Sequence, residues 1–230
     1  MTIAPEFLDA LALAAENFPG PRQIPWPQPS IPGGFVSFAN FAEWQRVVLG
    51  FRLPNGVPDD MVALFDRALK LYLVAWLDFD LITSAEMAAL AALEHSLRDC
   101  YLGHFREQHN KAIVAKAVKE KRLPSVEENF KPEKIPLAVL LRHMHEHDGL
   151  TDDKVSCVRK YGVSVMKLLT GESDPSLASM RNARAHGNPL GSDYRSGLLE
   201  LARDLIEYAY RRRIEEMCRF SRPLQIGVYG

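Results

Sequence analysis

The stretch SMRNARAHGNP, residues 179–189, places two arginines, an asparagine and a histidine within six positions. Asn182 and His186 are four residues apart and share one helical face, and the long side chain of Arg181 flanks that face. Arg184 is rotated by about 200° from Asn182. Arginine supplies a fixed fork of donors, asparagine supplies an amide, and histidine gives or takes a proton near neutral pH. Arg181, Asn182 and His186 therefore suit contact with one phosphate group.

A structural alternative explains the same three side chains. Arg181 and Asn182 would bind exposed carbonyl groups at a helix end. His186 would lie in the last turn, where the helix dipole favours a charged imidazole. The spacing of these residues does not separate the two interpretations.

The residues on either side of the motif predict a short helix. Asp174 suits the position that caps a helix N-terminus, and Pro175 suits the first helical position. Gly187 suits the position just past the end, and Pro189 prevents the helix from continuing. The sequence therefore predicts a helix over residues 175–186 with the motif at its C-terminal end.

Two segments of the chain resemble HEPN domains. The sequence RNARAH, residues 181–186, resembles the Arg-x4–6-His motif of that superfamily, and Gly187 follows as in its RN…AHG form. The sequence AALAALEHSLRD, residues 88–99, resembles an earlier helix of bacterial HEPN-like proteins that carries an ALE..LR pattern. The resemblance extends over residues 81–220 and does not include the N-terminal quarter of the chain.

The resemblance implies a small helical bundle and a reaction on RNA. Many HEPN domains dimerise across a cleft and act as metal-independent endoribonucleases in toxin–antitoxin, phage-defence and RNA-processing systems. His186 would then move the proton of the 2′-hydroxyl or of the leaving oxygen, and Arg181 would stabilise charge at phosphorus. Asn182 would position the phosphate or the imidazole. The expected partners are RNA, a second copy of the chain and an antitoxin or other regulatory protein, with no cofactor and no metal.

The same superfamily also contains members that are not nucleases. Some are adaptors, some bind nucleotides, and some accompany a separate nucleotidyltransferase. The alternative function is therefore a non-catalytic module that binds RNA, a nucleotide or another protein.

Glu94 and Arg98 are a second pair of interest because they are four residues apart, in the order that favours a helical ion pair. Glu94 lies beside the apolar face of its predicted helix. An acid at this place would orient the arginine or histidine of the motif. An ordinary ion pair on the surface is the alternative.

The run RHMHEHD offers a metal site as a further alternative. His143 and His147 share a helical face and could bind zinc. His145 is rotated away from that face by about 200°. The alternative is a polar helix end, where histidines suit the dipole.

Two basic stretches could contact phosphates if they lay beside the motif. Such stretches are more often solvated faces. The first comprises Arg106, Lys111, Lys116, Lys119, Lys121 and Arg122, and the second comprises Arg211, Arg212 and Arg213.

Apolar spacing and turn residues predict an all-α fold after an irregular N-terminal segment. Residues 18–35 hold six prolines and three glycines, which predicts an extended strap that is neither helix nor strand, pinned by Trp26. A proline-motif ligand for a partner is the alternative. Residues 152–170 are predicted as one helix. We divide the chain into an N-terminal helix and strap over residues 1–57 and a HEPN-like helical domain over residues 58–230.

Composition limits the remaining function classes. Of the 230 residues, 47% are hydrophobic and 25% are charged, which is typical of a globular protein with a proper core. The net charge of −1 gives no overall basic field for nucleic acid. Three widely spaced cysteines match no metal or disulfide pattern and indicate a reducing cytoplasm. The N-terminus is a poor signal peptide, and no apolar run has the length of a membrane span.

Overall fold

The computed structural model describes residues 3–29, 34–121, 130–185 and 197–220. These residues are mostly helical, which confirms the predicted all-α class. The elements in chain order are α1 (Pro5–Ala15), β1 (Arg22–Pro25), β2 (Phe35–Phe38), α2 (Phe41–Leu49), α3 (Asp59–Val74), α4 (Leu81–Lys119), the 3-10 turn η1 (Pro132–Lys134), α5 (Leu137–Glu146), the 3-10 turn η2 (Asp152–Lys154), α6 (Ser156–Tyr161), α7 (Met166–Thr170), α8 (Leu177–Ala185), α9 (Leu198–Ala209) and α10 (Arg211–Phe220).

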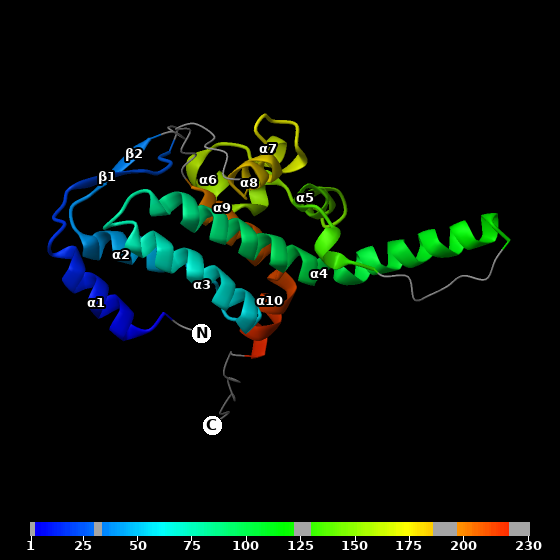
Figure 1. Ribbon diagram of the computed structural model, residues 1–230, viewed down its shortest axis with the longest axis horizontal. Helices are drawn as coiled ribbons and strands as arrows, with labels where there is room; N and C mark the ends of the chain where they lie inside the picture. Colours follow the sequence, from blue (N-terminus) through cyan, green and yellow to red (C-terminus); the bar gives the residue numbers. More distant parts are fainter. Residues whose placement is uncertain (1–2, 30–33, 122–129, 186–196, 221–230) are drawn as a thin grey trace, which may run out of the picture.

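Helix α4 is the central element, and α3 and α9 pack along its first half (Figure 1). Its apolar residues Leu90, Leu93, Leu97 and Tyr101 recur at intervals of three and four and are all buried. This spacing is that of one helical face. The burial of this stripe against two helices fixes the orientation of every other side chain on α4, including Glu94.

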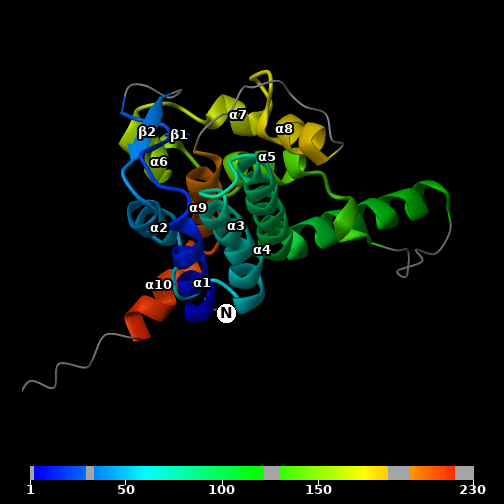
Figure 2. The ribbon, with the colours of Figure 1, turned by 60° about the vertical axis from the view of Figure 1, so that its left-hand side comes forward.

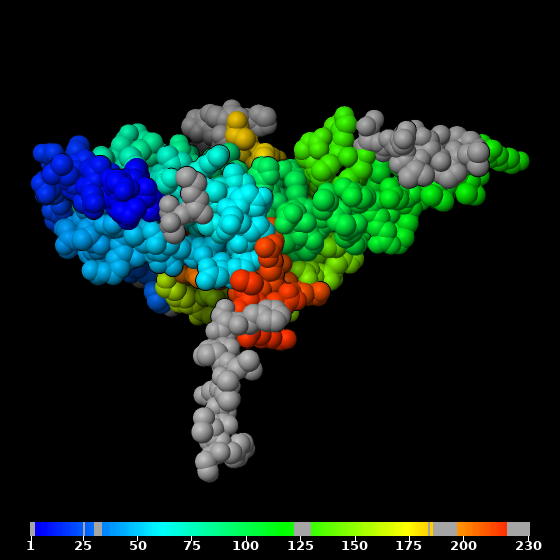
Figure 3. Space-filling view, turned by 90° about the horizontal axis from the view of Figure 1, so that it is seen from below, coloured from blue at the N-terminus to red at the C-terminus, as the bar shows by residue number. Residues whose placement is uncertain are grey.

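The second half of α4 projects beyond the rest of the molecule (Figures 1 and 3). The helix has 39 residues and is therefore about 58 Å long. After Tyr101, Ala117 is the one residue of α4 that is buried in the described structure. Val114 and Val118 are exposed. The basic stretch of residues 106–119 thus continues the same helix rather than starting a new one.

The N-terminal segment differs from the irregular strap that the sequence predicts. Four of its residues form β1, which pairs with β2 in an antiparallel ribbon, with Arg22 opposite Phe38 and Pro25 opposite Phe35. A two-stranded ribbon has only edge strands, so Pro25 costs no ladder bond to a further strand. The prediction that this segment contains no strand is therefore wrong for residues 22–25.

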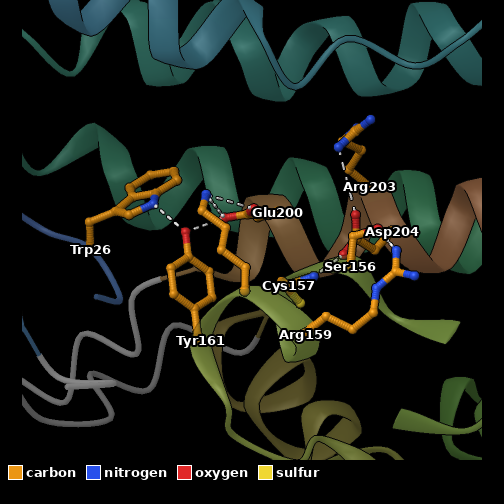
Figure 4. Close-up of polar contacts among 9 residues, drawn as sticks. Trp26, Ser156, Cys157, Arg159, Tyr161, Glu200, Arg203 and Asp204 are labelled. Atoms are coloured by element: carbon orange, nitrogen blue, oxygen red, sulfur yellow. Dashed lines mark hydrogen bonds and ion pairs between the residues drawn. The ribbon is translucent and has the colours of Figure 1, made fainter. Parts of the chain in front are cut away.

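Trp26 is buried, as predicted, and it joins the N-terminal segment to the helices. Its indole ring stacks on Phe51 with ring centroids 5.5 Å apart and meets Trp44 edge-on at 6.0 Å. Its Nε1–H donates to the hydroxyl of Tyr161 at 3.3 Å, and that hydroxyl donates to Glu200 at 2.6 Å (Figure 4). The buried polar tip of the indole thus has a partner on α6, which is in turn fastened to α9.

Residues 152–170 do not form the single helix that the sequence predicts. The segment contains η2, α6 and α7, with Gly162 left-handed at φ 73° after α6 and Gly171 at φ 88° after α7. A glycine in this conformation ends a helix because it carries no Cβ. Asp152 accepts a hydrogen bond from the backbone N–H of Val165 at 3.1 Å, which closes the segment into a compact turn. The turned view shows α7 and α8 beside α5 (Figure 2).

One hydrophobic core joins residues from both sides of the predicted boundary at residue 57. Trp44 and Val48 from the N-terminal part share it with Phe65, Leu93 and Leu205. Within the described ranges, no helix combines the length and the apolar composition needed to cross a membrane.

Candidate functional site

Helix α8 carries the arginine motif, and it begins later than the sequence predicts. The hydroxyl of Ser176 accepts a hydrogen bond from the backbone N–H of Ser179 at 3.1 Å, which is the geometry of an N-terminal cap. The prediction of Asp174 as the cap is therefore wrong, and the helix starts at Leu177. Leu177 and Met180 are buried, and α8 packs against α4, α5 and α7. This packing holds Arg181 beside the first half of α4.

Arg181 forms an ion pair with Glu94 of α4. Its Nη2 lies 2.6 Å from Oε2 of Glu94, whose side chain is 6% exposed, while the Arg181 side chain is 31% exposed. Its Nη1 donates to Oδ1 of the neighbouring Asn182 at 3.2 Å. The guanidinium is thus fixed at two points, and part of it still faces solvent.

Glu94 is shared by two arginines. Its Oε1 accepts from Nη2 of Arg98, which also donates to the carbonyls of Glu133 and Ile135 at 3.3 Å each. The Arg98 side chain is 18% exposed, so this pair is mostly buried and does not lie on open surface. One carboxylate between two guanidinium groups leaves one excess positive charge, which favours an anion beside Arg181.

The rest of the motif is described only in part. Asn182 is exposed and, as noted, bonded to Arg181. His186 and Gly187 lie outside the described residues, so the face that Asn182 and His186 are predicted to share stays a prediction. The predicted supporting residues Glu94 and Arg98 do lie together with Arg181.

A second cluster gathers three histidines from two helices. His143 on α5 lies between His147, with ring centroids 5.0 Å apart, and His104 of α4, at 4.1 Å. His104 and His147 are 5.9 Å apart. His145 turns away from the cluster, and its Nδ1–H donates to the carbonyl of Leu150 at 2.9 Å. The sequence indicated the shared face of His143 and His147 but did not connect them with His104.

The cluster is not arranged as a metal centre. Among the residues that the structure describes, no group of three or more His, Cys, Asp or Glu side chains is placed to hold a metal ion. The zinc interpretation of the run RHMHEHD therefore gains no support from the geometry.

Asp148 lies beside the histidines and joins four helices. Its carboxylate accepts from both Nη atoms of Arg211, at 2.8 and 2.5 Å, and from the hydroxyl of Tyr101 at 2.8 Å. Its carbonyl accepts from the hydroxyl of Tyr208 at 2.8 Å. Burial opposes ionisation of Asp148, but the hydrogen bonds from Arg211 and Tyr101 outweigh it and lower the pKa of the carboxyl.

We expect His143 to make the protein less stable as the pH falls through the usual histidine range toward its lowered folded-state pKa. Burial lowers the pKa of the His143 imidazole, and charge on His104 and His147 lowers it further. The unfolded chain then takes up a proton that the folded chain resists. This stabilisation is complete above the usual histidine range and is lost as the pH falls through that range toward the lowered pKa. Urea unfolding over a series of pH values measures the slope.

A pair of substitutions separates His143 from the other histidines. The His143→Gln protein should show a flatter dependence of the unfolding free energy on pH, whatever its absolute stability. His95 is exposed on α4, so the His95→Gln protein should keep the slope of the unaltered chain. Equal slopes in the two variants would contradict the expectation.

The two basic stretches occupy different places. Lys111 pairs with Glu107 at 2.7 Å on the projecting half of α4, and Arg106 lies over the ring of Phe130 at 6.0 Å. Arg211 to Arg213 begin α10, where Arg211 is engaged by Asp148 and Arg212 is exposed beside the histidine cluster. Arg122 lies outside the described residues.

The chain was compared with models of known protein families, with curated proteins and with solved structures, and none of the three comparisons gives a match.

Proposed function

We propose that this protein is a metal-independent endoribonuclease of the HEPN type. The observation that supports the proposal is the ion pair of Arg181 with the buried carboxylate of Glu94, which Arg98 shares. It joins the two segments in which the sequence resembles HEPN domains. It also leaves one excess positive charge next to a guanidinium that is partly exposed to solvent.

The reaction needs few groups because RNA carries its own nucleophile in the 2′-hydroxyl. The 2′-oxygen attacks the adjacent phosphorus, the bond to the 5′-oxygen breaks, and a cyclic phosphate remains. His186 would move the proton of the attacking or the leaving oxygen. Arg181 would stabilise the charge that develops on the phosphoryl oxygens, and Asn182 would position the phosphate or the imidazole.

The contacts of Arg181 suit this role. A guanidinium has five N–H donors in a rigid plane, and Glu94 and Asn182 engage one donor each at its two terminal nitrogens. The remaining donors keep a fixed direction. A donor that is oriented before the reaction costs no reorganisation when charge develops in the transition state.

The expected surroundings of this activity come from the resemblance. A second copy of the chain would complete the cleft, and an antitoxin or another regulatory protein would restrain cleavage in a toxin–antitoxin or phage-defence system. The cytoplasm is the expected location.

The second candidate is a non-catalytic module of the same type that binds RNA, a nucleotide or another protein. The observation in its favour is that both terminal nitrogens of Arg181 already have partners within the chain. An arginine that only joins α8 to α4 would show the same contacts.

Cleavage of a mixed RNA pool in excess EDTA tests the proposal. We expect purified protein to produce fragments that end in a cyclic phosphate. His186→Ala and Arg181→Ala should each remove this cleavage because they take away the proton carrier and the charge that faces phosphorus. Fragment ends are read by their resistance to phosphatase before mild acid treatment.

Arg142→Ala is the matched control. Arg142 is exposed on α5, and its loss removes the same charge without touching the motif. Cleavage that survives in the His186→Ala protein would overturn the proposal. Absence of cleavage from the folded, unaltered protein would favour the binding module.

A further inference from the structure

The histidine cluster lines a pocket of about 400 Å³ that the proposed reaction does not use. The pocket lies where α4, the end of α5 and the start of α10 meet. The polar side chains of its wall that matter here are those of His104, His143, His147, Asp148, Arg211 and Arg212. His104 lies ten residues after Glu94, which is about 15 Å along α4. The pocket is thus distinct from the site of Arg181.

The single carboxylate in this wall is already neutralised. Both Nη atoms of Arg211 contact the carboxylate of Asp148, and Tyr101 donates to it as well. Arg212 is exposed, so its guanidinium adds a positive charge that Asp148 does not neutralise. The net charge of the wall is therefore positive even when every histidine is neutral.

The histidines add donors in a confined space. His143 is 9% exposed, and its closest ring contacts are with His104, Tyr101 and His147. An imidazole carries one N–H donor when neutral and two when charged. Nε2 of His104 accepts from the side-chain amide of Gln108 at 2.8 Å, so its donor is Nδ1–H. The three imidazoles and the exposed guanidinium of Arg212 line one small volume.

The other titratable groups of the wall do not offset this charge. Burial raises the pKa of the Cys100 thiol to about 12, and burial together with Asp148 raises the pKa of the Tyr101 hydroxyl. Both groups are therefore neutral at physiological pH. The fixed charges of the wall are those of Asp148, Arg211 and Arg212.

We propose that this pocket binds a phosphate group, carried by a nucleotide or by the end of an RNA chain. A phosphate anion offers acceptor oxygens that match imidazole N–H groups and the planar donors of Arg212. A cation would meet the charge of Arg212, and, as stated, the described residues hold no set of ligands for a metal. The proposal does not depend on cleavage at Arg181.

Calorimetric titration of the full chain with inorganic phosphate at about pH 6.5 tests the pocket. We expect saturable binding with a dissociation constant in about the millimolar range or tighter. Arg212→Gln and His147→Gln should each weaken it by about tenfold, the loss of one charge-assisted hydrogen bond. Both side chains are exposed, so neither change threatens the fold. Arg213→Gln is the control, because Arg213 is exposed on the same helix and lines a different pocket.

Two further probes identify what carries the phosphate. A 2′-O-methyl trinucleotide with a 5′-phosphate is compared with the same molecule without it, and both are compared with ADP. The methyl groups block cleavage, so the result is independent of the proposed ribonuclease activity. A preference for the phosphorylated trinucleotide would indicate an RNA end, and a preference for ADP would indicate a free nucleotide. Either preference supports the pocket if Arg212→Gln removes it.

Three results would overturn the proposal. The first is the absence of saturable binding of every probe up to about 10 mM. The second is equal binding by the Arg212→Gln and Arg213→Gln proteins. The third is tight binding of Zn²⁺ that His147→Gln removes while phosphate does not bind. If the protein cleaves RNA but the pocket fails these tests, the proposed function is kept and only the phosphate pocket is rejected.

Discussion

The Glu94→Gln protein is expected to be about 2–3 kcal/mol less stable than the unaltered chain. The side chain of Glu94 is 6% exposed and accepts from Arg181 and Arg98, so water has little access to replace its carboxylate. Glutamine has a similar shape but no charge, so both guanidinium groups lose their counter-ion. Removing one partner of a buried ion pair costs more than the pair contributes, because the remaining charge stays desolvated. Urea unfolding followed by circular dichroism measures the change.

The same helix provides a matched control. Glu107 and Lys111 have the same i,i+4 spacing as Glu94 and Arg98, but both side chains are exposed. Water and salt replace the ion pair at such a site, so Glu107→Gln should leave the stability unchanged within error. If the two substitutions had equal effects, burial of Glu94 would not be what makes its ion pairs matter.

If Arg181 acts on phosphorus, the folded Glu94→Gln protein should also cleave RNA about 100-fold more slowly. Glu94 does not touch the substrate in the proposed reaction, and its effect passes through the direction of the Arg181 guanidinium. The Glu94→Gln, Arg181→Lys protein should then be no slower than Arg181→Lys alone, because the two changes remove one function. Additive losses in cleavage would mean that Glu94 does not act through Arg181.

The central helices were predictable because their burial follows a local period. Leu90, Leu93, Leu97 and Tyr101 recur at helical spacing, so the buried face of α4 follows from the sequence. The helix that carries the motif was also predictable, with an error of two residues at the start of α8. That error arose because Ser176 competes with Asp174 for the cap, and only the folded backbone selects between them.

Two local predictions failed because weak signals compete. In residues 152–170 the apolar spacing predicts one helix, but Gly162 adopts the left-handed conformation and breaks it. Around Pro25 the prolines predict irregular chain, but pairing with residues 35–38 satisfies the backbone of a short strand. In both cases a contact or a single backbone angle outweighed the average secondary-structure propensity of the segment.

The sites depend on contacts that the spacing of residues does not reveal. Glu94 and Arg181 are 87 residues apart, and His104 and His143 are 39 residues apart. The sequence suggested an acid on the earlier helix as a partner for the motif, because Glu94 lies at the border of the apolar stripe. No pattern in the sequence connected His104 with the run RHMHEHD, because a histidine on an apolar face can serve many roles.

Asp148→Asn is expected to lower the stability by about 2–3 kcal/mol near neutral pH. Asparagine can still accept from Tyr101, but it no longer balances the charge of Arg211, whose two terminal nitrogens point at it. The loss should be larger than for an exposed acid because the Asp148 side chain is 16% exposed. Asp153→Asn is the control, since Asp153 is exposed and lies five residues further along the chain.

The dependence of this loss on pH identifies its cause. Because the pKa of Asp148 is lowered in the folded state, its stabilisation is present above the usual aspartate range and is lost as the pH falls through the folded-state pKa. The unaltered chain and the Asp148→Asn protein should therefore differ most near pH 7 and converge below about pH 3 in urea unfolding. A difference that stayed constant over this range would show that packing, and not the charge that faces Arg211, joins α5 to α10.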